Sequence, residues 1–99
     1  MRTKGDRSSV MMPDVQFRAI GRALADPHRF AILQQVAAAE GMPCASLQEH
    51  AVLSPATISH HMKELSEAGL IDITRKGRDA YLSLLRPVLD AYLERLASL

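Results

Sequence analysis

The pattern of apolar and polar positions between Ser54 and Gly69 predicts a helix with a signal at each end. Three apolar residues recur at the i, i+4 and i+7 positions and predict one buried stripe: Ile58, Met62 and Leu65. Ser54 can cap the first turn with its hydroxyl, and Pro55 suits the first helical position, which needs no amide hydrogen. Gly69 can adopt the left-handed conformation that ends a helix. The pattern therefore predicts a helix over residues 55–68.

The rest of this helix carries hydroxyls, imidazoles and an ammonium group, and no carboxylate precedes Glu64. Short donors and a cation on an exposed helix suit the major groove of DNA, which is lined with acceptors and phosphates. A solvated face is the alternative interpretation. Because neighbouring helical side chains diverge, His60 is expected to contact DNA and His61 to pack or bridge. The predicted DNA contacts on this helix are Ser54, Thr57, Ser59, His60 and Lys63.

Two helices are predicted before this one. The first covers residues 14–25, and its apolar face consists of Val15, Ala19, Ile20, Ala23 and Leu24, with Phe17 on the flank. Asp26 followed by Pro27 is a typical start signal for the second, which is expected to run to about Ala39. Its predicted buried stripe is Phe30, Leu33, Val36 and Ala37, and Gly41 and Pro43 stop it.

A short helix is predicted over residues 46–53. Ser46 and Glu49 match a capping box, in which each side chain bonds the free amide of the other residue. Leu47 and Ala51 would then point inward. Two short helices joined by a tight link, with polar donors exposed on the second, form the helix-turn-helix arrangement.

The apolar pattern changes to alternation after Gly69, which predicts two strands over residues 70–74 and 80–84. The turn between them, residues 75–79, contains three cations: Arg75, Lys76 and Arg78. A solvated hairpin tip is one interpretation. Directly after a candidate recognition helix, a basic hairpin is better explained as a wing that lies along DNA phosphates or the minor groove.

The last predicted helix begins at Pro87, and its apolar stripe is too wide for a solvated terminal helix: Leu85, Val88, Leu89, Tyr92, Leu93, Leu96 and Leu99. A surplus apolar face usually indicates an interface. The first and last helices are therefore predicted to pair in a homodimer. The predicted contacts are Val15, Ala19, Leu89, Tyr92, Leu93 and Leu96. Two recognition helices about one DNA turn apart would require an imperfectly palindromic operator.

Composition limits the function classes. Ninety-nine residues make one domain, and an apolar content of 47% with only 4% aromatic residues suits packed helices. The net charge of +1 means that nucleic-acid binding must depend on where the charges lie. Residues 1–13 are predicted to be a flexible tail and residues 14–99 the domain. No membrane span or signal peptide is apparent, so a cytoplasmic protein is expected, associated with the nucleoid when bound to DNA.

The sequence contains one cysteine, Cys44, which excludes an internal disulfide and a Cys-rich zinc site. Cys44 is either a small buried hydrophobe or a thiol switch that needs a partner across a dimer. Phosphate-binding glycine loops, nucleophile elbows and metal-hydrolase pairs are all absent from the sequence. No enzyme activity, cofactor or metal site is therefore expected.

Three segments resemble the ArsR-type winged-helix repressors: residues 24–33, residues 53–71 and residues 75–81. The resemblance covers about residues 15–99. It implies a mainly α fold of about five helices with a β-hairpin wing. It also implies a homodimeric repressor that leaves its operator when a signal arrives. The DNA contacts that it implies are Ser54, Thr57, Ser59, His60, Lys63, Arg75 and Arg78.

Two departures concern the signal. Many relatives carry a Cys-x-Cys metal site before the recognition helix, where this chain has Pro43-Cys44-Ala45-Ser46. Others place carboxylate and histidine ligands on the last helix, where this chain has Asp90 and Glu94 but no histidine. The signal is therefore unidentified and is not expected to act through the family's usual metal sites.

A second class of function is a winged-helix module that binds proteins and not DNA, because folds are reused. Such a module should expose apolar or aromatic anchors on the helix over residues 55–68. This helix carries Thr57, Ser59, His60 and Lys63, which favours DNA.

Overall fold

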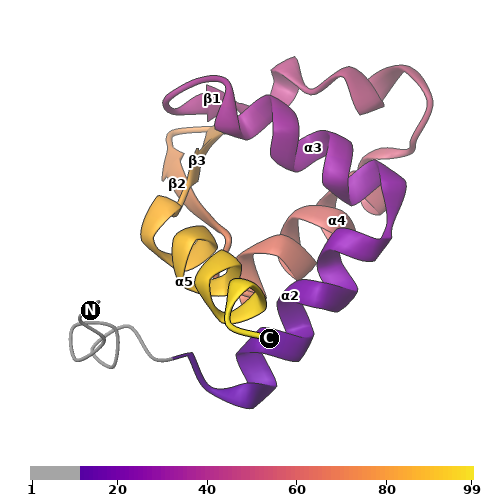
Figure 1. Cartoon of the computed structure of the whole chain (residues 1–99). Coiled ribbons are helices and arrows are strands. Elements are labelled where there is room, and N and C mark those ends of the chain that lie inside the picture. Colours follow the sequence, from indigo (N-terminus) through magenta and orange to yellow (C-terminus); the bar gives the residue numbers. More distant parts are fainter. Residues whose placement is uncertain (1–11) are drawn as a thin grey trace.

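The computed structural model describes residues 12–99, so most of the predicted tail lies outside the described residues. Within this range, a small antiparallel sheet lies at one edge of a group of helices (Figure 1). The α-helices are α2 (Asp14–Ala25), α3 (Pro27–Ala37), α4 (Pro55–Glu67) and α5 (Arg86–Ala97). Two 3-10 turns, η1 (Cys44–Ser46) and η2 (Gln48–Ala51), connect α3 to α4. The strands are β1 (Met42–Pro43), β2 (Ile71–Lys76) and β3 (Asp79–Leu84).

The predicted boundary between the first two helices is confirmed. The Asp26 carboxylate accepts hydrogen bonds from the amides of His28 (2.8 Å) and Arg29 (3.0 Å), and Pro27 occupies the first position of α3. Helix α3 ends at Ala37, two residues earlier than expected.

The predicted stripe of α3 is only partly right. Leu33 and Val36 are buried, together with Ile32, whereas Phe30 is 44% exposed and Ala37 is exposed. The buried face is rotated towards Ile32 because α3 packs against both α2 and the sheet, and Phe30 lies outside that contact.

The predicted helix over residues 46–53 is wrong. Leu47, between the two 3-10 turns, has extended backbone angles (φ −64°, ψ 133°), and Ser46 caps no helix. Gln35 on α3 replaces the capping box: its amide nitrogen donates to Glu49 Oε1 (2.8 Å), and its carbonyl oxygen accepts from the Gln48 amide (2.9 Å). This tertiary contact satisfies the polar groups that the sequence pattern assigned to a local cap.

The two 3-10 turns also determine which side chains of this segment are buried. Leu47 is 2% exposed, as predicted, but Ala51 is exposed. A continuous helix would have placed Leu47 and Ala51 on one face, since residues four apart are neighbours on a helix.

The hairpin is confirmed, and it is part of a three-stranded sheet. The strand order is β1-β3-β2, with both pairs antiparallel. The pairing extends further than predicted, to Lys76 opposite Asp79, and Gly77 adopts the positive φ of 64° that the tight turn requires. Strand β1, which the sequence did not predict, pairs Met42 with Leu82 and Pro43 with Tyr81.

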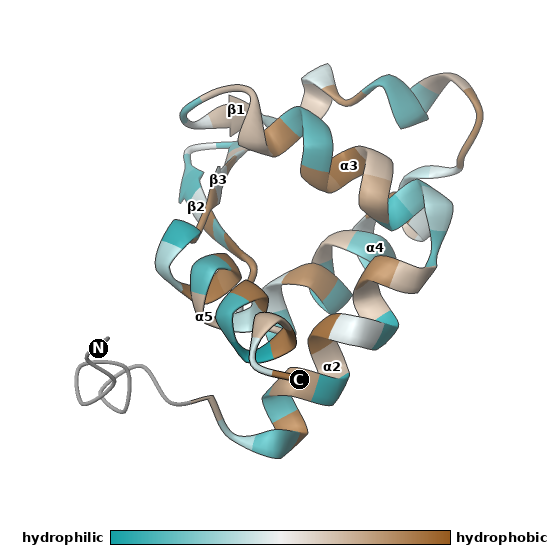
Figure 2. Cartoon of the chain, viewed as in Figure 1, coloured by the Kyte–Doolittle hydropathy of each residue, from teal (hydrophilic) through white to brown (hydrophobic). Residues whose placement is uncertain are grey.

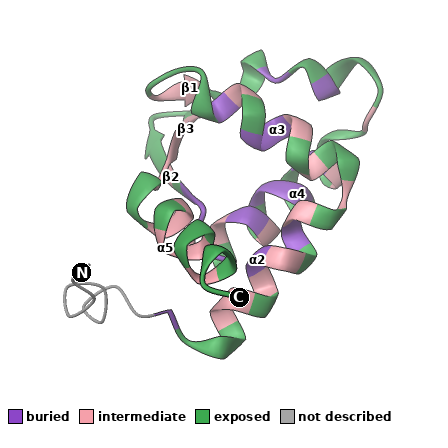
Figure 3. Cartoon of the chain, viewed as in Figure 1, coloured by how far each residue is buried: buried purple, intermediate pink, exposed green. Residues whose placement is uncertain are grey.

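The core lies between α2, α3, α4 and the sheet, where the most hydrophobic segments of the ribbon meet (Figure 2). Its largest fully buried side chains are Ile20, Ile32, Val36, Ile58, Leu65, Leu70, Ile71 and Leu82. The predicted stripe of α4 is therefore buried, with Met62 at 7% exposure. Met12, just before α2, packs in this core too. No residue of α5 is buried in the described chain (Figure 3), which leaves this helix the least enclosed.

Candidate nucleic-acid interface

Helix α4 is closed at both ends. Ser54 Oγ accepts a hydrogen bond from the Thr57 amide (3.2 Å) and donates one to Thr57 Oγ1 (3.0 Å). At the other end Gly69 has a φ of 86°, and the Leu70 amide donates to the Leu65 carbonyl (3.0 Å). This is the left-handed ending that the sequence predicted. Ser54 and Thr57, both predicted to contact DNA, are thus bonded to each other at the start of the helix.

Gly69 also lies close to a side chain of α2. A Cβ at this position would lie 2.5 Å from Gln16 Nε2, which donates to the carbonyl of Ala68 (3.0 Å). The Gln16 side chain on α2 therefore occupies the space beside Gly69, and a larger residue there would displace the Gln16 amide from its bond to Ala68. This contact holds the end of α4 against α2.

One row of α4 faces solvent along its length: Ala56, Ser59, His60 and Lys63. The side chains of His60 and Lys63 are 63% and 69% exposed, and each lies 3.9 Å from a carboxylate one turn later, Glu64 and Glu67 respectively. Exposed pairs of this kind contribute little to stability. The imidazole and ammonium groups can therefore turn towards another partner at small cost.

Ala56 belongs to this exposed row, although the sequence analysis did not name it. Its position three residues before Ser59 and four before His60 places it on the same row, and it is exposed. Helical spacing was the available signal, but an alanine carries no polar group that would have indicated a contact.

His61 packs between helices, one of the two alternatives that the sequence left open. It is 7% exposed, and Arg29 on α3 donates a hydrogen bond to its Nδ1 with 3.3 Å between the nitrogens. Arg29 Nε also donates to the carbonyl of Ala23 (3.0 Å) on α2. Arg29 therefore joins α2, α3 and α4, and His61 receives this contact on the buried side of α4.

The environment of His61 favours the neutral imidazole. Burial lowers the pKa of His61, and the positive charge of Arg29 and the neighbouring imidazoles of His60 and His28 lower it further. Asp26 acts in the opposite direction. The ring centroids of His28 and His60 lie 6.3 Å and 6.1 Å from that of His61.

The cations of the wing are exposed to solvent. Arg75, Lys76 and Arg78 are exposed, and none of them forms an ion pair with another residue in the range 12–99. Lys76 Nζ lies 5.7 Å from the centroid of the Tyr81 ring, a weak cation–π contact. The three cations therefore follow α4 closely in the chain and remain accessible to phosphates.

Arg95 fixes the C-terminal helix to the start of α2. Its guanidinium donates to Asp14 Oδ1 (2.8 Å) and to the carbonyl of Met12 (3.3 Å). It also lies 4.1 Å above the ring of Phe17. Hydrogen bonds from Arg18 and Arg95 hold the pKa of the Asp14 carboxyl below its ordinary value.

The six predicted dimer residues divide into two groups. Val15, Leu93 and Leu96 are 73%, 50% and 39% exposed. Ala19, Leu89 and Tyr92 are half-buried against the core of their own chain. Tyr92 packs on Phe17 with 5.1 Å between ring centroids. Leu99, just after α5, is exposed too, and the ion pair between Arg95 and Asp14 joins α5 to α2.

Cys44 is half-buried, and its thiol donates to the sulfur of Met62 (3.3 Å). Burial raises the pKa of this thiol, although the nearby charge of Arg75 lowers it to a smaller extent. The surroundings thus favour the unreactive thiol over the thiolate. Among residues 12–99, no three His, Cys, Asp or Glu side chains are grouped so that they could hold a metal ion.

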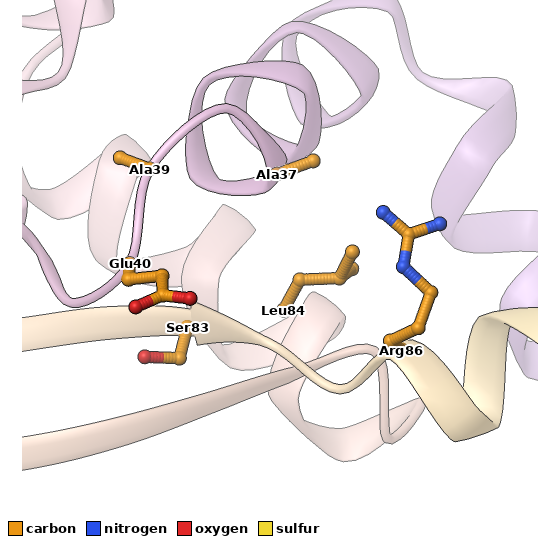
Figure 4. Close-up of a pocket in the computed structure, with 6 residues that line it drawn as sticks. All are labelled: Ala37, Ala39, Glu40, Ser83, Leu84 and Arg86. Carbon is orange, nitrogen blue, oxygen red and sulfur yellow. The ribbon is translucent and has the colours of Figure 1, made fainter.

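A pocket of about 420 Å³ lies away from these residues, between the end of α3 and the junction of β3 with α5 (Figure 4). Its lining consists of Ala37, Ala39, Glu40, Ser83, Leu84 and Arg86. It shares no residue with the predicted DNA contacts. In Figure 4 its carboxylate and its guanidinium lie at opposite sides.

The fold and the exposed α4 row define a winged helix-turn-helix protein, and comparisons with known proteins agree. A family described as a helix-turn-helix domain matches residues 24–74. The HTH-type transcriptional regulator YceK of Bacillus subtilis, itself uncharacterized, is 34% identical over 82 residues, which cover 81% of this chain and 82% of that protein. The chain therefore belongs to the helix-turn-helix transcriptional regulators, and specifically to the ArsR type.

Two solved structures show the same architecture. An ArsR-like transcriptional regulator from Rhodococcus sp. RHA1 superposes with a TM-score of 0.70 at 25% identity, covering 85% of this chain and 81% of that one. A possible ArsR-family regulator from Mycobacterium bovis superposes with a TM-score of 0.68 at 22% identity, covering 99% and 90%. The latter is a homodimeric winged helix-turn-helix DNA-binding domain. None of the described helices of our chain has the length and apolarity needed to cross a bilayer.

Proposed function

We propose that this protein is a sequence-specific DNA-binding repressor that acts as a homodimer in the cytoplasm, on nucleoid DNA, and leaves its operator when a signal arrives. One observation carries the proposal: α4 is capped at both ends and buried on one side, and presents Ser59, His60 and Lys63 on the other. Helices that enter the major groove have this organisation.

The chemistry of the exposed row supports DNA over a protein partner. Protein-binding surfaces concentrate their energy in large apolar or aromatic anchors. The exposed row of α4 offers a hydroxyl, an imidazole and an ammonium, and its only apolar side chain is a methyl group. The wing adds Arg75, Lys76 and Arg78, which would neutralise phosphates beside the groove.

The homodimer is supported by exposed apolar side chains on α2 and α5. Val15 and Leu93 are at least half exposed there, in a chain whose other large apolar side chains are mostly enclosed. A second copy would cover them, and the Mycobacterium bovis relative with this fold is a homodimer. Two-fold symmetry would place the two α4 helices about 34 Å apart on an imperfect palindrome.

The proposed release does not use the metal sites common in the family. Cys44 is a single thiol whose environment keeps it protonated, and α5 contains Asp90 and Glu94 without a histidine. Addition of zinc to the protein–DNA complex is therefore expected to leave the complex intact.

The test is a fluorescence-anisotropy titration against the DNA upstream of the protein's own gene and a scrambled duplex, each at two salt concentrations. The proposal requires preferential binding to the upstream DNA that saturates at two subunits per site. His60→Ala should reduce this preference more than it reduces nonspecific binding, whereas Gln34→Ala, an exposed change on α3, should have no effect. Equal and weak binding to both duplexes would contradict the proposal and favour a protein-interaction module.

A further inference from the structure

The start of α4 exposes apolar side chains where a groove-reading helix would first meet the bases. Ala56, in the first turn, is exposed, and Val52, in the link before the helix, is 71% exposed. An exposed valine would ordinarily need no explanation, but here it precedes the capping residue Ser54 by two positions. Both side chains therefore lie at the N-terminal end of the candidate recognition helix.

The Ser54 hydroxyl at this end is already engaged within the protein, whereas Thr57 Oγ1 accepts the Ser54 hydrogen and keeps its own. Ser54 Oγ accepts from the Thr57 amide and donates to Thr57 Oγ1, so the cap uses the donor hydrogen of Ser54 within the protein. Ala56 adds only a methyl group to the row that continues with Ser59 and His60. The first turn therefore presents a methyl group beside the partly engaged hydroxyls of Ser54 and Thr57.

One base has a matching apolar group. Thymine presents its C5-methyl in the major groove, and small apolar side chains such as alanine contact that methyl in protein–DNA complexes. N-terminal residues of a recognition helix are also the ones that contact base edges in helix-turn-helix proteins. A methyl-to-methyl contact would exclude water from both partners.

We propose that Ala56, assisted by Val52, recognises the C5-methyl group of thymine in each half of the operator. This inference rests on the proposed function, because it presumes that α4 enters the major groove. It assigns sequence discrimination to two residues without hydrogen-bonding side chains. Removal of one recognised methyl should weaken binding about fourfold, the effect expected from exposing one buried methyl-sized group.

The experiment replaces each thymine of the upstream binding site singly by uracil, which lacks only the methyl. Anisotropy titrations then compare the wild type with Ala56→Ser, Val52→Ala and a matched control, Ala39→Ser, on an exposed site at the end of α3. All three changes are small and exposed, and melting temperatures would verify intact folding. At least one uracil position per half-site should weaken the wild type and the control about fourfold, and this loss should disappear in Ala56→Ser or Val52→Ala.

Two results would overturn the inference while leaving the proposed function intact. The first is specific binding that no uracil substitution weakens. The second is uracil sensitivity that persists undiminished in both Ala56→Ser and Val52→Ala, which would assign the contact to other residues. Loss of all preference for the upstream site with wild-type protein would overturn the proposed function, and this inference with it.

Discussion

The guanidinium of Arg29 on α3 donates a hydrogen bond to Nδ1 of the buried His61 on α4, with 3.3 Å between the two nitrogens. Arginine cannot accept a hydrogen bond, so His61 Nδ1 carries no proton in this contact. The contact that joins α3 to α4 therefore depends on a neutral imidazole held beside a fixed cation.

Acid should destabilise this arrangement. Burial lowers the pKa of His61 in the folded chain, whereas in the unfolded chain the value is about 6.5. The unfolded state then binds more protons, so the free energy of unfolding should stay level above about pH 7 and fall below about pH 6.5. Urea denaturation at pH 7.5 and 5.5 measures this change.

The variant His61→Gln keeps an acceptor for Arg29 but does not titrate. It should lose less stability than the wild type over the same pH interval. His50→Gln is the control: it removes an imidazole at η2 that lies outside the Arg29–His61 contact, with its Nε2 3.1 Å from the Cys44 carbonyl oxygen, and it should retain the loss of stability that His61 causes. An identical pH dependence in His61→Gln and the wild type would show that His61 is not the responsible group.

Replacing the cap of α4 should separate stability from DNA binding. Ser54→Ala removes the acceptor of the Thr57 amide and should lower the free energy of unfolding by about 1 kcal/mol. Ser54→Asp restores a capping oxygen and should recover most of that loss. Ser59→Ala on the same helix makes no such bond and should leave chemical denaturation unchanged; a loss equal to that of Ser54→Ala would refute the cap.

The carboxylate introduced by Ser54→Asp should nevertheless weaken DNA binding, since it would lie near phosphates. Recovered stability together with weakened DNA binding in Ser54→Asp is expected of a residue that both caps α4 and lies beside the DNA.

The wing should contribute affinity without specificity. Arg75→Ala and Arg78→Ala should each weaken binding to all duplexes alike and reduce the slope of log affinity against log salt by about one. Arg86→Ala removes the same charge at the start of α5 and should leave the slope unchanged. A change in preference for one base position, at constant slope, would mean that the wing arginine reads a base.

Dimerisation should depend on the exposed apolar side chains of α2 and α5. The double change of Leu93 and Leu96 to glutamate should give monomers in analytical ultracentrifugation. Folding should survive, because these side chains are 50% and 39% exposed, whereas Leu89 is half-buried against the core. Val52→Glu places a carboxylate at another exposed apolar site and should leave the dimer intact. A persistent dimer in the double variant would place the interface elsewhere.

Cys44 should have no role in sensing. Its thiol has a raised pKa and donates to Met62, so alkylation near neutral pH should be slow. Cys44→Ser should retain DNA affinity and release by the signal. Loss of release in Cys44→Ser, with affinity and melting temperature maintained, would instead identify the thiol as a switch.

Much of the fold could be predicted because its signals are local. Asp26-Pro27 and Ser54-Pro55 start their helices as expected, since a cap and a proline act within one turn. Gly69 and Gly77 adopt positive φ angles where the sequence indicated an ending and a turn. The predicted DNA contacts Ser59, His60 and Lys63 are exposed on α4 as expected, whereas Ala56 on the same row has no polar group and was not named from the sequence.

The sequence by itself determined the order of helices, the hairpin and the buried stripe of α4, because periodicity and capping depend on residues a few positions apart. Only the tertiary structure decided what happens between α3 and α4. There the Gln35 side chain, fourteen positions before Glu49, donates a hydrogen bond to the Glu49 carboxylate. Two 3-10 turns form in place of the capped helix that the sequence predicted. Likewise, Arg29 bonds to His61, which is buried, whereas the neighbouring His60 is exposed. In both places, contacts between residues far apart in the sequence decide the structure. A short-range sequence pattern contains no information about such contacts.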